Sequence, residues 1–216
     1  MPKKNKINLP WIEKYRPKKI NNIVGQKNII NTLNNSIENN NLPHLLLYGP
    51  PGSGKTSTGL ALAYKLYGPK YFKERILELN ASDERGIKVV REKIRNFAKK
   101  SINQVIDDEY KKKHPVPPYK IIILDEADSM TDDSQFALRR IIEKYSSITR
   151  FFLICNYVTR IIEPLTSRCA KYRFKALKGN CINEIINKIC TSEKLITNEN
   201  VNKKIIKNSE GDLRKA

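Results

Sequence analysis

Short apolar runs recur along most of the chain, and segments of helical period separate them. Four runs have the length and the Leu, Ile and Phe content of strands that are buried on both faces. A fifth run, Tyr172–Phe174, is weaker. The four strong runs are residues 45–48, 76–79, 121–124 and 151–154. Strands that alternate with helices predict a three-layer α/β fold, with a parallel sheet covered by helices on both faces.

The strand pattern stops after Phe174. From about Leu177 the apolar positions follow a helical period and predict two helices, with these residues on their buried faces: Ile182, Ile185, Ile186, Ile189, Val201, Ile205 and Ile206. We therefore expect two units, an α/β domain at 1–175 and a small helical domain at 176–216. The pattern is still helical at Ala216, so we expect the chain to be truncated before a further C-terminal part.

The segment from Ile106 to Tyr119 interrupts these patterns. It contains three consecutive lysines, Lys111–Lys113, and three prolines. Such a composition predicts a solvated loop rather than part of the core.

A phosphate-binding pattern directly follows the first predicted strand. Residues 49–56 match G-x-x-x-x-G-K-[ST] and are Gly49, Pro50, Pro51, Gly52, Ser53, Gly54, Lys55 and Thr56, with Ser57 next in the helix. Glycines allow the backbone N–H groups to point at phosphate oxygens, and the helix N-terminus adds its dipole. In this pattern Lys55 reaches the β- and γ-phosphates, and the Thr56 hydroxyl ligates Mg²⁺. The sequence therefore predicts a site for ATP and Mg²⁺.

Polar residues follow the third and fourth predicted strands. Asp125 and Glu126 come directly after one strand, and Asn156 follows the next. A carboxylate at Asp125 suits the Mg²⁺ shell, and Glu126 is then placed to orient and activate the attacking water. Asn156 is predicted to contact the γ-phosphate or that water, and Asp128 is expected to be no more than a helix cap. The pair Asp125–Glu126 predicts hydrolysis rather than nucleotide binding alone.

Of the features of the composition, only charge indicates a class of partner. Lys and Arg outnumber Asp and Glu by 41 to 22, a formal net charge of +19, which favours a polyanionic partner such as nucleic acid. A general excess of Lys, Asn and Ile along the chain is an alternative reason for this charge.

The four cysteines form no C-x-x-C pair, so neither zinc nor disulfides are expected: Cys155, Cys169, Cys181 and Cys190. No apolar run approaches the roughly 18 residues of a membrane span, so no membrane partner is expected.

Basic residues also repeat along one predicted helix. Lys88, Arg91, Arg95 and Lys99 are three or four residues apart, which places them on one face, opposite the apolar positions. Two interpretations remain open for this stripe, a solvated surface and a contact with nucleic-acid phosphates.

Several longer motifs resemble one family, the clamp-loader small subunits of replication factor C, which are AAA+ P-loop NTPases. The resemblance covers nearly the whole chain, and the strings S-R-C and N-A-S-D-E-R-G are its most specific parts. Its motifs lie at residues 11–17, 49–56, 78–86, 125–128, 135–140, 163–169 and 211–216. The fold that the resemblance implies is an AAA+ domain with a helical lid, truncated before the collar that joins subunits into a ring.

The resemblance also implies roles for residues. Arg168 resembles an arginine finger that acts in trans on ATP of a neighbouring subunit, whereas a lone Arg would otherwise be read as a surface ion pair. Arg214 resembles a sensor of the γ-phosphate, and Asn80 a switch that restrains Glu126. Residues similar to the adenine pocket are Tyr15, Arg16, Pro17, Val24 and Gly25, and those similar to phosphate-backbone contacts with DNA are Arg85, Arg91 and Arg160.

The function implied by the resemblance is ATP-driven opening and loading of a sliding clamp onto primer–template DNA. The implied partners are the other subunits of a hetero-pentamer, a PCNA-type clamp and DNA, in the nucleus, with hydrolysis only in the assembled complex. Two alternatives remain at this stage, another AAA+ loader for origins or helicases and a nucleotide-binding scaffold without turnover.

Overall fold

The computed structural model describes residues 9–82, 87–100 and 106–216, and it gives no side-chain description for residues 87–90. Within these residues, five parallel strands form one sheet in the order β2-β3-β4-β1-β5. The strands are β1 (His44–Tyr48), β2 (Ile76–Asn80), β3 (Lys120–Asp125), β4 (Thr149–Cys155) and β5 (Cys169–Arg173). The predicted parallel sheet is confirmed, although β5 begins three residues before the predicted fifth run.

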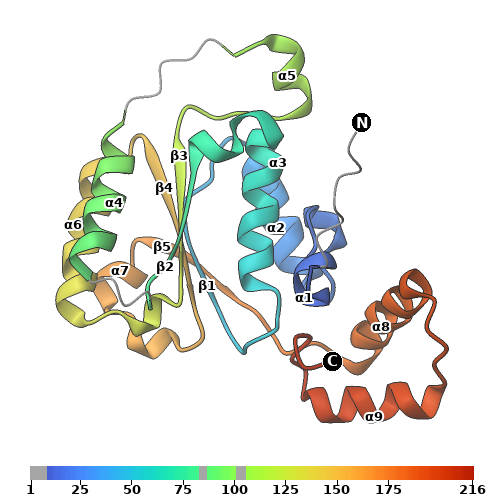
Figure 1. The fold of residues 1–216 in the computed structure, drawn as a ribbon. Helices are drawn as coiled ribbons and strands as arrows, with labels where there is room; N and C mark the ends of the chain where they lie inside the picture. The colour runs from blue at the N-terminus through green and yellow to red at the C-terminus, as the bar shows by residue number, and fades with distance from the viewer. Residues whose placement is uncertain (1–8, 83–86, 101–105) are drawn as a thin grey trace.

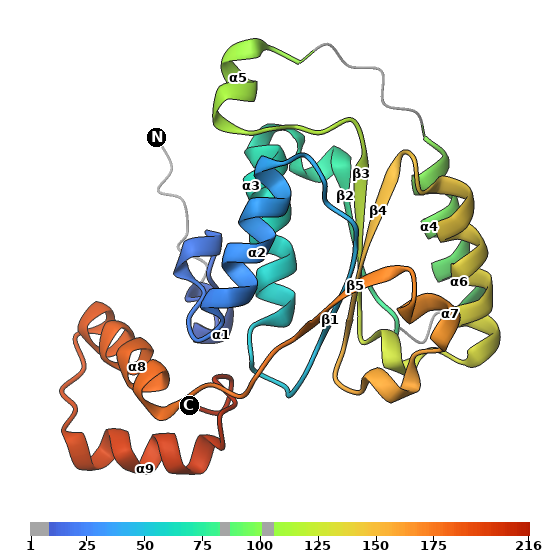
Figure 2. The ribbon, with the colours of Figure 1, turned by 180° about the vertical axis from the view of Figure 1, so that it is seen from behind.

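Helices cover both faces of the sheet, as Figures 1 and 2 show from opposite sides. One face carries α2 (Lys27–Glu38) and α3 (Lys55–Arg75), and the other carries α4 (Ile87–Lys99), α6 (Asp132–Tyr145) and α7 (Glu163–Thr166). Shorter elements complete this unit: α1 (Trp11–Lys14), α5 (Asp108–Lys113) and the 3-10 turns η1 (Ile20–Asn22), η2 (Ala127–Ser129) and η3 (Val158–Arg160).

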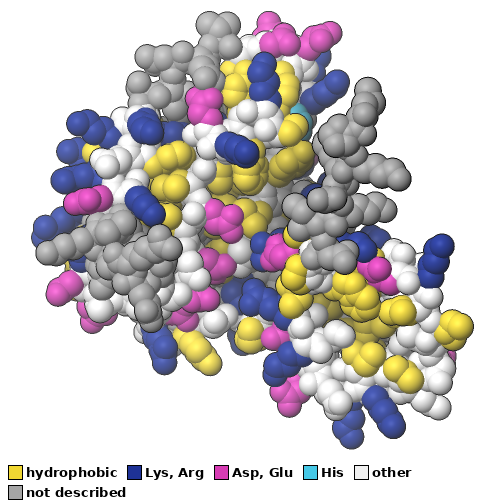
Figure 3. Space-filling model, viewed as in Figure 1, with side chains coloured by type: hydrophobic (Ala, Val, Ile, Leu, Met, Phe, Trp, Pro, Cys, Tyr) yellow, Lys and Arg dark blue, Asp and Glu magenta, His cyan; other side chains and the backbone are white. Residues whose placement is uncertain are grey.

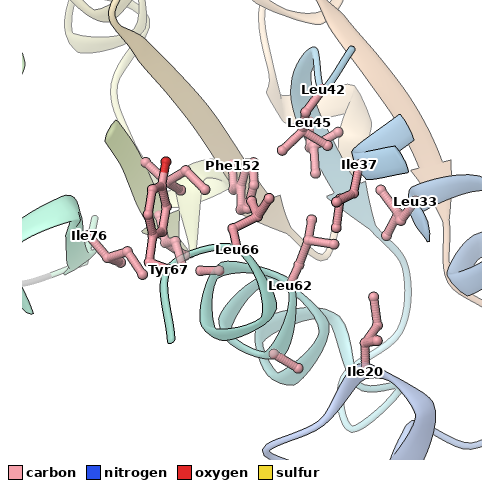
Figure 4. Close-up of a cluster of buried hydrophobic side chains, with 14 of the residues drawn as sticks. Ile20, Leu33, Ile37, Leu42, Leu45, Leu62, Leu66, Tyr67, Ile76 and Phe152 are labelled. Atoms are coloured by element: carbon pink, nitrogen blue, oxygen red, sulfur yellow. The ribbon is translucent and has the colours of Figure 1, made fainter. Parts of the chain in front are cut away.

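The pleat of the central strands divides the core into two clusters. In β4, Phe152 and Ile154 pack with α2 and α3, whereas Phe151 and Leu153 pack with α4 and α6. Successive side chains of a strand point to opposite faces, so a strand covered on both faces needs apolar residues at every position. This explains why the central strands read as continuous apolar runs. Figure 4 shows the first cluster, with Leu33, Ile37, Leu62, Leu66 and Tyr67 from the two helices.

Two further helices, α8 (Gly179–Glu193) and α9 (Glu199–Ser209), lie beside the α/β unit and are named here the helical pair (Figure 1). They have a small apolar cluster of their own, centred on Leu177, Ile182 and Ile186. The predicted face is wrong at Val201, which is 44% exposed. Residues 210–216 form turns rather than the predicted helix.

The prediction of a solvated loop at 106–119 is wrong in part. Its described residues include α5, and the segment after α5 packs onto α3. Val116 is buried and its N–H donates to the carbonyl of Leu66 at 2.9 Å, while the Tyr110 hydroxyl donates to the carbonyl of Tyr67 at 3.0 Å. These contacts lie where α3 kinks at Gly68, which has a φ of 58° and precedes Pro69. The kink exposes backbone groups of α3, and the segment supplies their partners.

Candidate nucleotide site

The phosphate loop connects β1 to α3 and lies at the carboxyl edge of the sheet. Gly49, Gly52 and Gly54 have φ values of 141°, 65° and 94°, a region that side chains with a Cβ rarely adopt. Gly52 also faces the C-terminal segment, where an added Cβ would lie 1.8 Å from Asp212 Oδ1. Position 52 therefore requires glycine, both for the conformation of the loop and for the close approach of Asp212.

Lys55 folds back over the loop. Its ammonium donates to the carbonyls of Gly49 and Pro50, both at 2.8 Å, and to Asn156 Oδ1 at 2.9 Å. The residue is 7% exposed, and burial lowers the pKa of Lys55 while the charge of Asp125 opposes that shift. Lys55 and Asn156, which were predicted separately as site residues, are thus brought together at the loop from sequence positions 101 residues apart.

Thr56 and Asp125 meet at the same edge. The Thr56 hydroxyl donates to Asp125 Oδ2 at 2.7 Å, and the other carboxylate oxygen accepts from the backbone N–H of Glu126 at 2.9 Å. A hydroxyl and a carboxylate side by side are the oxygen ligands that Mg²⁺ prefers. The donor set therefore fits the predicted magnesium ion. Elsewhere in the described part of the chain, no group of three or more His, Cys, Asp or Glu side chains is arranged to hold a metal.

Glu126 leaves β3 in a left-handed conformation, with φ 53° and ψ 38°. Its side chain is exposed, while its carbonyl accepts from the Ser129 hydroxyl at 2.8 Å. Non-glycine residues in this conformation carry strain of about 1 kcal/mol or more, which is often found at functional sites. The backbone thus directs the Glu126 carboxylate away from the sheet and toward solvent beside the phosphate loop.

Asp128 has a larger role than the predicted helix cap. Its Oδ2 accepts the backbone N–H groups of Asn156 and Tyr157 at 3.1 and 3.0 Å. The carboxylate therefore joins the ends of β3 and β4 and fixes the backbone that presents Asn156. Acidic residues are common after strands, so the sequence alone did not distinguish this role.

Gln135 of α6 lies in one of the family motifs, but the sequence assigned no individual role to it. It is 1% exposed, and its amide donates to the carbonyls of Met130 and Arg160 at 3.1 and 2.9 Å. Its Oε1 accepts from the N–H of Ile162 at 2.9 Å. Gln135 therefore links α6 to the loop after Asn156. The sequence offers one sign of this role, because Gln135 lies at helical spacing from the apolar Leu138 and Ile142.

Asn80 lies at the end of β2, in register with Asp125 of β3. Its side-chain oxygen accepts from the backbone N–H and the hydroxyl of Ser82 at 3.0 and 2.9 Å. The predicted switch role of Asn80 toward Glu126 remains a prediction, because its described hydrogen bonds are local.

Of the predicted adenine-pocket residues, Tyr15 and Gly25 contact the helical pair or the segment that leads into it. The Tyr15 hydroxyl donates to Glu193 at 2.6 Å, Arg16 forms an ion pair with Glu13 at 3.3 Å, and Pro17 is partly buried. Val24 is partly buried and Gly25 faces the Leu177 side chain.

Gln26 follows this segment and was missed by the sequence analysis. It is 5% exposed, and its amide nitrogen donates to the carbonyl of Lys175 at 2.7 Å and of Ser53 at 3.5 Å. It joins the N-terminal segment, the phosphate loop and the connection to α8. Gln26 precedes α2 without belonging to its periodic pattern, so no sequence signal marks it.

Arg214 comes close to the phosphate loop from the C-terminal side. Its backbone N–H donates to Asp212 Oδ1 at 2.8 Å, and its positive charge contributes to lowering the pKa of Lys55. The structure thus brings the C-terminal segment with Asp212 and Arg214 up to the phosphate loop, where a Cβ added at Gly52 would meet Asp212.

Arg168 lies on the other side of the molecule from this site. It directly precedes β5, whose first residue pairs with His44 and whose last pairs with Tyr48, next to the phosphate loop. The five-residue strand separates the two ends by roughly 16 Å. The Arg168 guanidinium donates to the carbonyl of Pro164 at 2.7 Å and pairs with Glu143 at 2.6 Å. It is therefore not part of the site formed by its own phosphate loop.

The basic residues of α4 differ in exposure because one of them packs against α6. Arg95 and Lys99 are exposed, whereas Arg91 is partly buried and donates to the Ser134 hydroxyl of α6 at 3.2 Å. Arg160 is exposed with its guanidinium 5.2 Å from the centre of the Tyr157 ring. Arg85 lies outside the described residues. Figure 3 shows Lys and Arg side chains gathered over the edge formed by α4 and α6.

Residues 45–177 match the AAA family, the ATPase family associated with various cellular activities. Together with the five-stranded parallel sheet and the phosphate loop, this match defines a P-loop ATPase, and the chain belongs to the AAA family. Within it, the predicted resemblance to replication factor C small subunits is confirmed. The chain is 54% identical to replication factor C subunit 2 of Saccharomyces cerevisiae and 53% identical to subunit 4 of Homo sapiens, over 95% and 96% of its length.

The chain spans 58% of the yeast relative and 56% of the human one. Among solved structures, the Thermotoga maritima RuvB Holliday junction branch migration motor matches with a TM-score of 0.68 at 20% identity, over 93% of this chain and 62% of that one. This second likeness concerns the fold. No helix in the described part of the chain is long and apolar enough to cross a membrane.

Proposed function

We propose that this chain is the ATP-hydrolysing module of a sliding-clamp loader, in which ATP binding and hydrolysis drive the loading of a clamp onto primer–template DNA. The observation that carries the proposal is the hydrogen-bonded set of Lys55, Asn156, Thr56 and Asp125 around the phosphate loop. Similarity to replication factor C subunits over 95% or more of the chain supports the clamp loader as the particular machine.

Each residue of the proposed site has a separate role. The backbone N–H groups of the loop and the Lys55 ammonium bind phosphate oxygens, and Thr56 and Asp125 would hold Mg²⁺. When bound, Mg²⁺ neutralises charge on the transferring phosphate. Glu126 orients and deprotonates the attacking water, and Asn156 positions it by hydrogen bonding. Tyr15, Arg16, Pro17, Val24 and Gly25 enclose the adenine, with Asn80 restraining Glu126.

Hydrolysis needs a second subunit. Because Arg168 and the phosphate loop lie at opposite ends of β5 and β1, the guanidinium serves the site of a neighbouring subunit in a ring. There it stabilises the charge that develops on the γ-phosphate, a contribution worth 10³–10⁵-fold in the related GTPase systems. Residues 176–216 would form the lid that brings Arg214 to the γ-phosphate in cis.

The proposed ring contains four other subunits, a PCNA-type clamp and DNA that is bound through its phosphates in the nucleus. Arg85, Arg91 and Arg160 are the proposed phosphate contacts, and the exposed Arg95 and Lys99 lie on the same helix as Arg91, α4.

The test is ATP turnover by this chain assembled with its partner subunits, with and without clamp and primed DNA. We expect clamp and DNA to stimulate turnover, and Arg168→Ala to remove that stimulation while ATP binding by this chain persists. An assembled complex that clamp and DNA fail to stimulate would contradict the clamp-loader function and leave an AAA ATPase with another client.

A further inference from the structure

Glu193 joins the helical pair to the N-terminal segment. It is the last residue of α8, and its Oε1 accepts from the Tyr15 hydroxyl at 2.6 Å and from the Lys14 ammonium at 2.5 Å. These residues are 178 and 179 positions apart in the chain. The Glu193 side chain is 20% exposed, and the Lys14 ammonium also lies 5.4 Å from the centre of the Tyr15 ring.

The charges of this contact are matched at neutral pH. The hydrogen bond from Lys14 is the main reason that the pKa of the Glu193 carboxyl lies below its ordinary value, and the hydrogen bond to Glu193 raises the pKa of the Tyr15 phenol. Glu193 is therefore an ionised acceptor and Tyr15 a protonated donor. Charge-assisted hydrogen bonds of this kind are stronger than neutral ones.

The contact lies at the far end of α8 from its connection to the sheet. At the near end, Gln26 bonds the carbonyl of Lys175, and Gly25 lies against Leu177. The fifteen residues of α8 span roughly 22 Å between its two ends. A helix attached at only one end is free to swing about that end, whereas a second attachment at Glu193 sets its direction. Figures 1 and 2 both show α1 next to α8.

Two parts of the candidate nucleotide site depend on that direction. Tyr15, on the N-terminal side, belongs to the proposed adenine pocket. Arg214, on the C-terminal side, follows the helical pair. Two residues earlier, Asp212 lies against the phosphate loop, where a Cβ added at Gly52 would be 1.8 Å from Asp212 Oδ1, and the N–H of Leu177 donates to the carbonyl of Gly211 at 3.4 Å. A swing of the helical pair about this end would therefore move Asp212 and Arg214 relative to the phosphate loop.

We propose that Glu193 is a positioning residue for nucleotide binding, which ties the end of α8 to Lys14 and Tyr15 and so holds Arg214 over the phosphate loop. The inference rests on the proposed ATP-binding function and deepens it. Glu193 touches no nucleotide itself. It couples the adenine side of the site to the phosphate side through the helical pair.

The test is calorimetric titration of the purified 216-residue chain with Mg²⁺ and ATP, using Glu193→Ala, Arg214→Ala and the double variant. We expect Glu193→Ala to raise the Kd about fivefold, the upper end for an exposed charge contact. We expect Arg214→Ala to raise the Kd by a smaller factor in the Glu193→Ala background than in the unmodified chain, because Arg214 is no longer held in place. Double-mutant cycles measure this coupling.

Two controls separate positioning from folding. Glu184 is an exposed acid of the same helix, so Glu184→Ala should leave the Kd unchanged. Glu193→Gln retains a hydrogen-bond acceptor for Tyr15. Its Kd should lie between the Kd of the unmodified chain and that of Glu193→Ala. Thermal unfolding without nucleotide should remain cooperative in all variants, with midpoints within about 4 °C of one another, the shift that the loss of about 1 kcal/mol produces.

Equal Kd values for Glu193→Ala and Glu184→Ala would overturn the inference, as would an Arg214→Ala effect of the same factor in both backgrounds. Failure of the unmodified chain to bind Mg²⁺ and ATP would instead contradict nucleotide binding, and the inference with it.

Discussion

The residues around the phosphate loop form one hydrogen-bonded unit before any ligand is considered. Lys55 contacts Asn156, Thr56 contacts Asp125, and Asp128 fixes the backbone at Asn156. These bonds join the ends of β1, β3 and β4, which are adjacent in the sheet. Glu126 is left exposed among them, which suits a group that must reach a water molecule.

Replacing Glu126 by Gln removes the proton acceptor but keeps the shape and leaves Lys55, Thr56 and Asp125 in place. We expect the variant to bind ATP with an unchanged Kd and to lose turnover by about 10²–10⁴-fold in the assembled complex, the usual contribution of a general base. Trapped ATP after gel filtration, measured by chromatography of the released nucleotide, checks this. Turnover at the unmodified rate would show that another group activates the water.

His44 at the start of β1 predicts a pH dependence of stability. Burial, together with the charge of Arg150, lowers the pKa of His44 to about 4, and its Nδ1 accepts from the N–H of Phe151 at 3.1 Å. The unfolded chain binds the proton at a pKa near 6.5, so it takes up protons first as the pH falls. The stability contributed by neutral His44 is therefore complete above about pH 6.5 and is lost between about pH 6.5 and 4.

The expected loss is about 2 kcal/mol, allowing for screening of the partly exposed ring. Urea unfolding of the chain and of His44→Gln at a series of pH values measures it. The free energy of unfolding of the variant should change less with pH over this interval, because its amide does not titrate. An equal change of this free energy with pH in the two proteins would contradict the role of His44.

At the scale of elements, β4 lies at the centre of the sheet and carries apolar side chains into both clusters of the core. The same aromatic residue type occurs at two very different places, because Phe152 is fully buried under α3 whereas Phe136 on α6 is 45% exposed. The two positions therefore allow the effect of burial on stability to be compared at a constant residue type.

We expect Phe152→Ala to lower the free energy of unfolding by about 3–5 kcal/mol, because it removes buried contacts and leaves a cavity. Phe136→Ala should change it by no more than about 0.5 kcal/mol. Chemical denaturation of both variants measures the difference. Similar losses for the two would mean that Phe136 is covered in solution.

At the scale of the whole molecule, two surfaces with candidate functional residues lie at opposite edges of the sheet. The candidate nucleotide site is at the carboxyl edge, and Arg168 is at the other edge. This arrangement agrees with the proposed ring, in which Arg168 would meet the phosphate loop of a neighbouring subunit. The basic edge over α4 and α6 is a third surface (Figure 3).

The proposed contact of that edge with DNA phosphates predicts a salt dependence. We expect Arg95→Ala in the assembled complex to weaken binding of primed DNA regardless of its sequence and to reduce the slope of log K against log salt by about 1, since one phosphate contact is lost. Lys207→Ala, an exposed position on α9, is the matched control and should leave the slope unchanged. Fluorescence anisotropy at several salt concentrations measures both. An unchanged slope for Arg95→Ala would place the DNA elsewhere.

Much of the fold and site was accessible from the sequence because it depends on local patterns. Continuous apolar runs mark strands buried on both faces, and the phosphate loop needs its glycines at fixed spacing. The positions of Asp125 and Asn156 after adjacent strands then follow from the common direction of parallel strands. Periodicity was less reliable in α9, where Val201 is exposed, and composition was less reliable in the segment 106–119, where Val116 and Tyr110 pack on α3.

The sequence by itself determined the class of fold, the phosphate loop and the acidic pair at Asp125 and Glu126, because backbone conformation and burial of each element impose residue types at short spacing. Only the tertiary structure showed that Asp128 and Gln26 join separate segments and that Glu193 meets Lys14 and Tyr15. These contacts depend on how the helical pair and the strand ends come together in space. An isolated polar residue in a sequence carries no mark of a partner that is distant along the chain, whether 28 positions away, as for Asp128 and Asn156, or 179, as for Glu193 and Lys14.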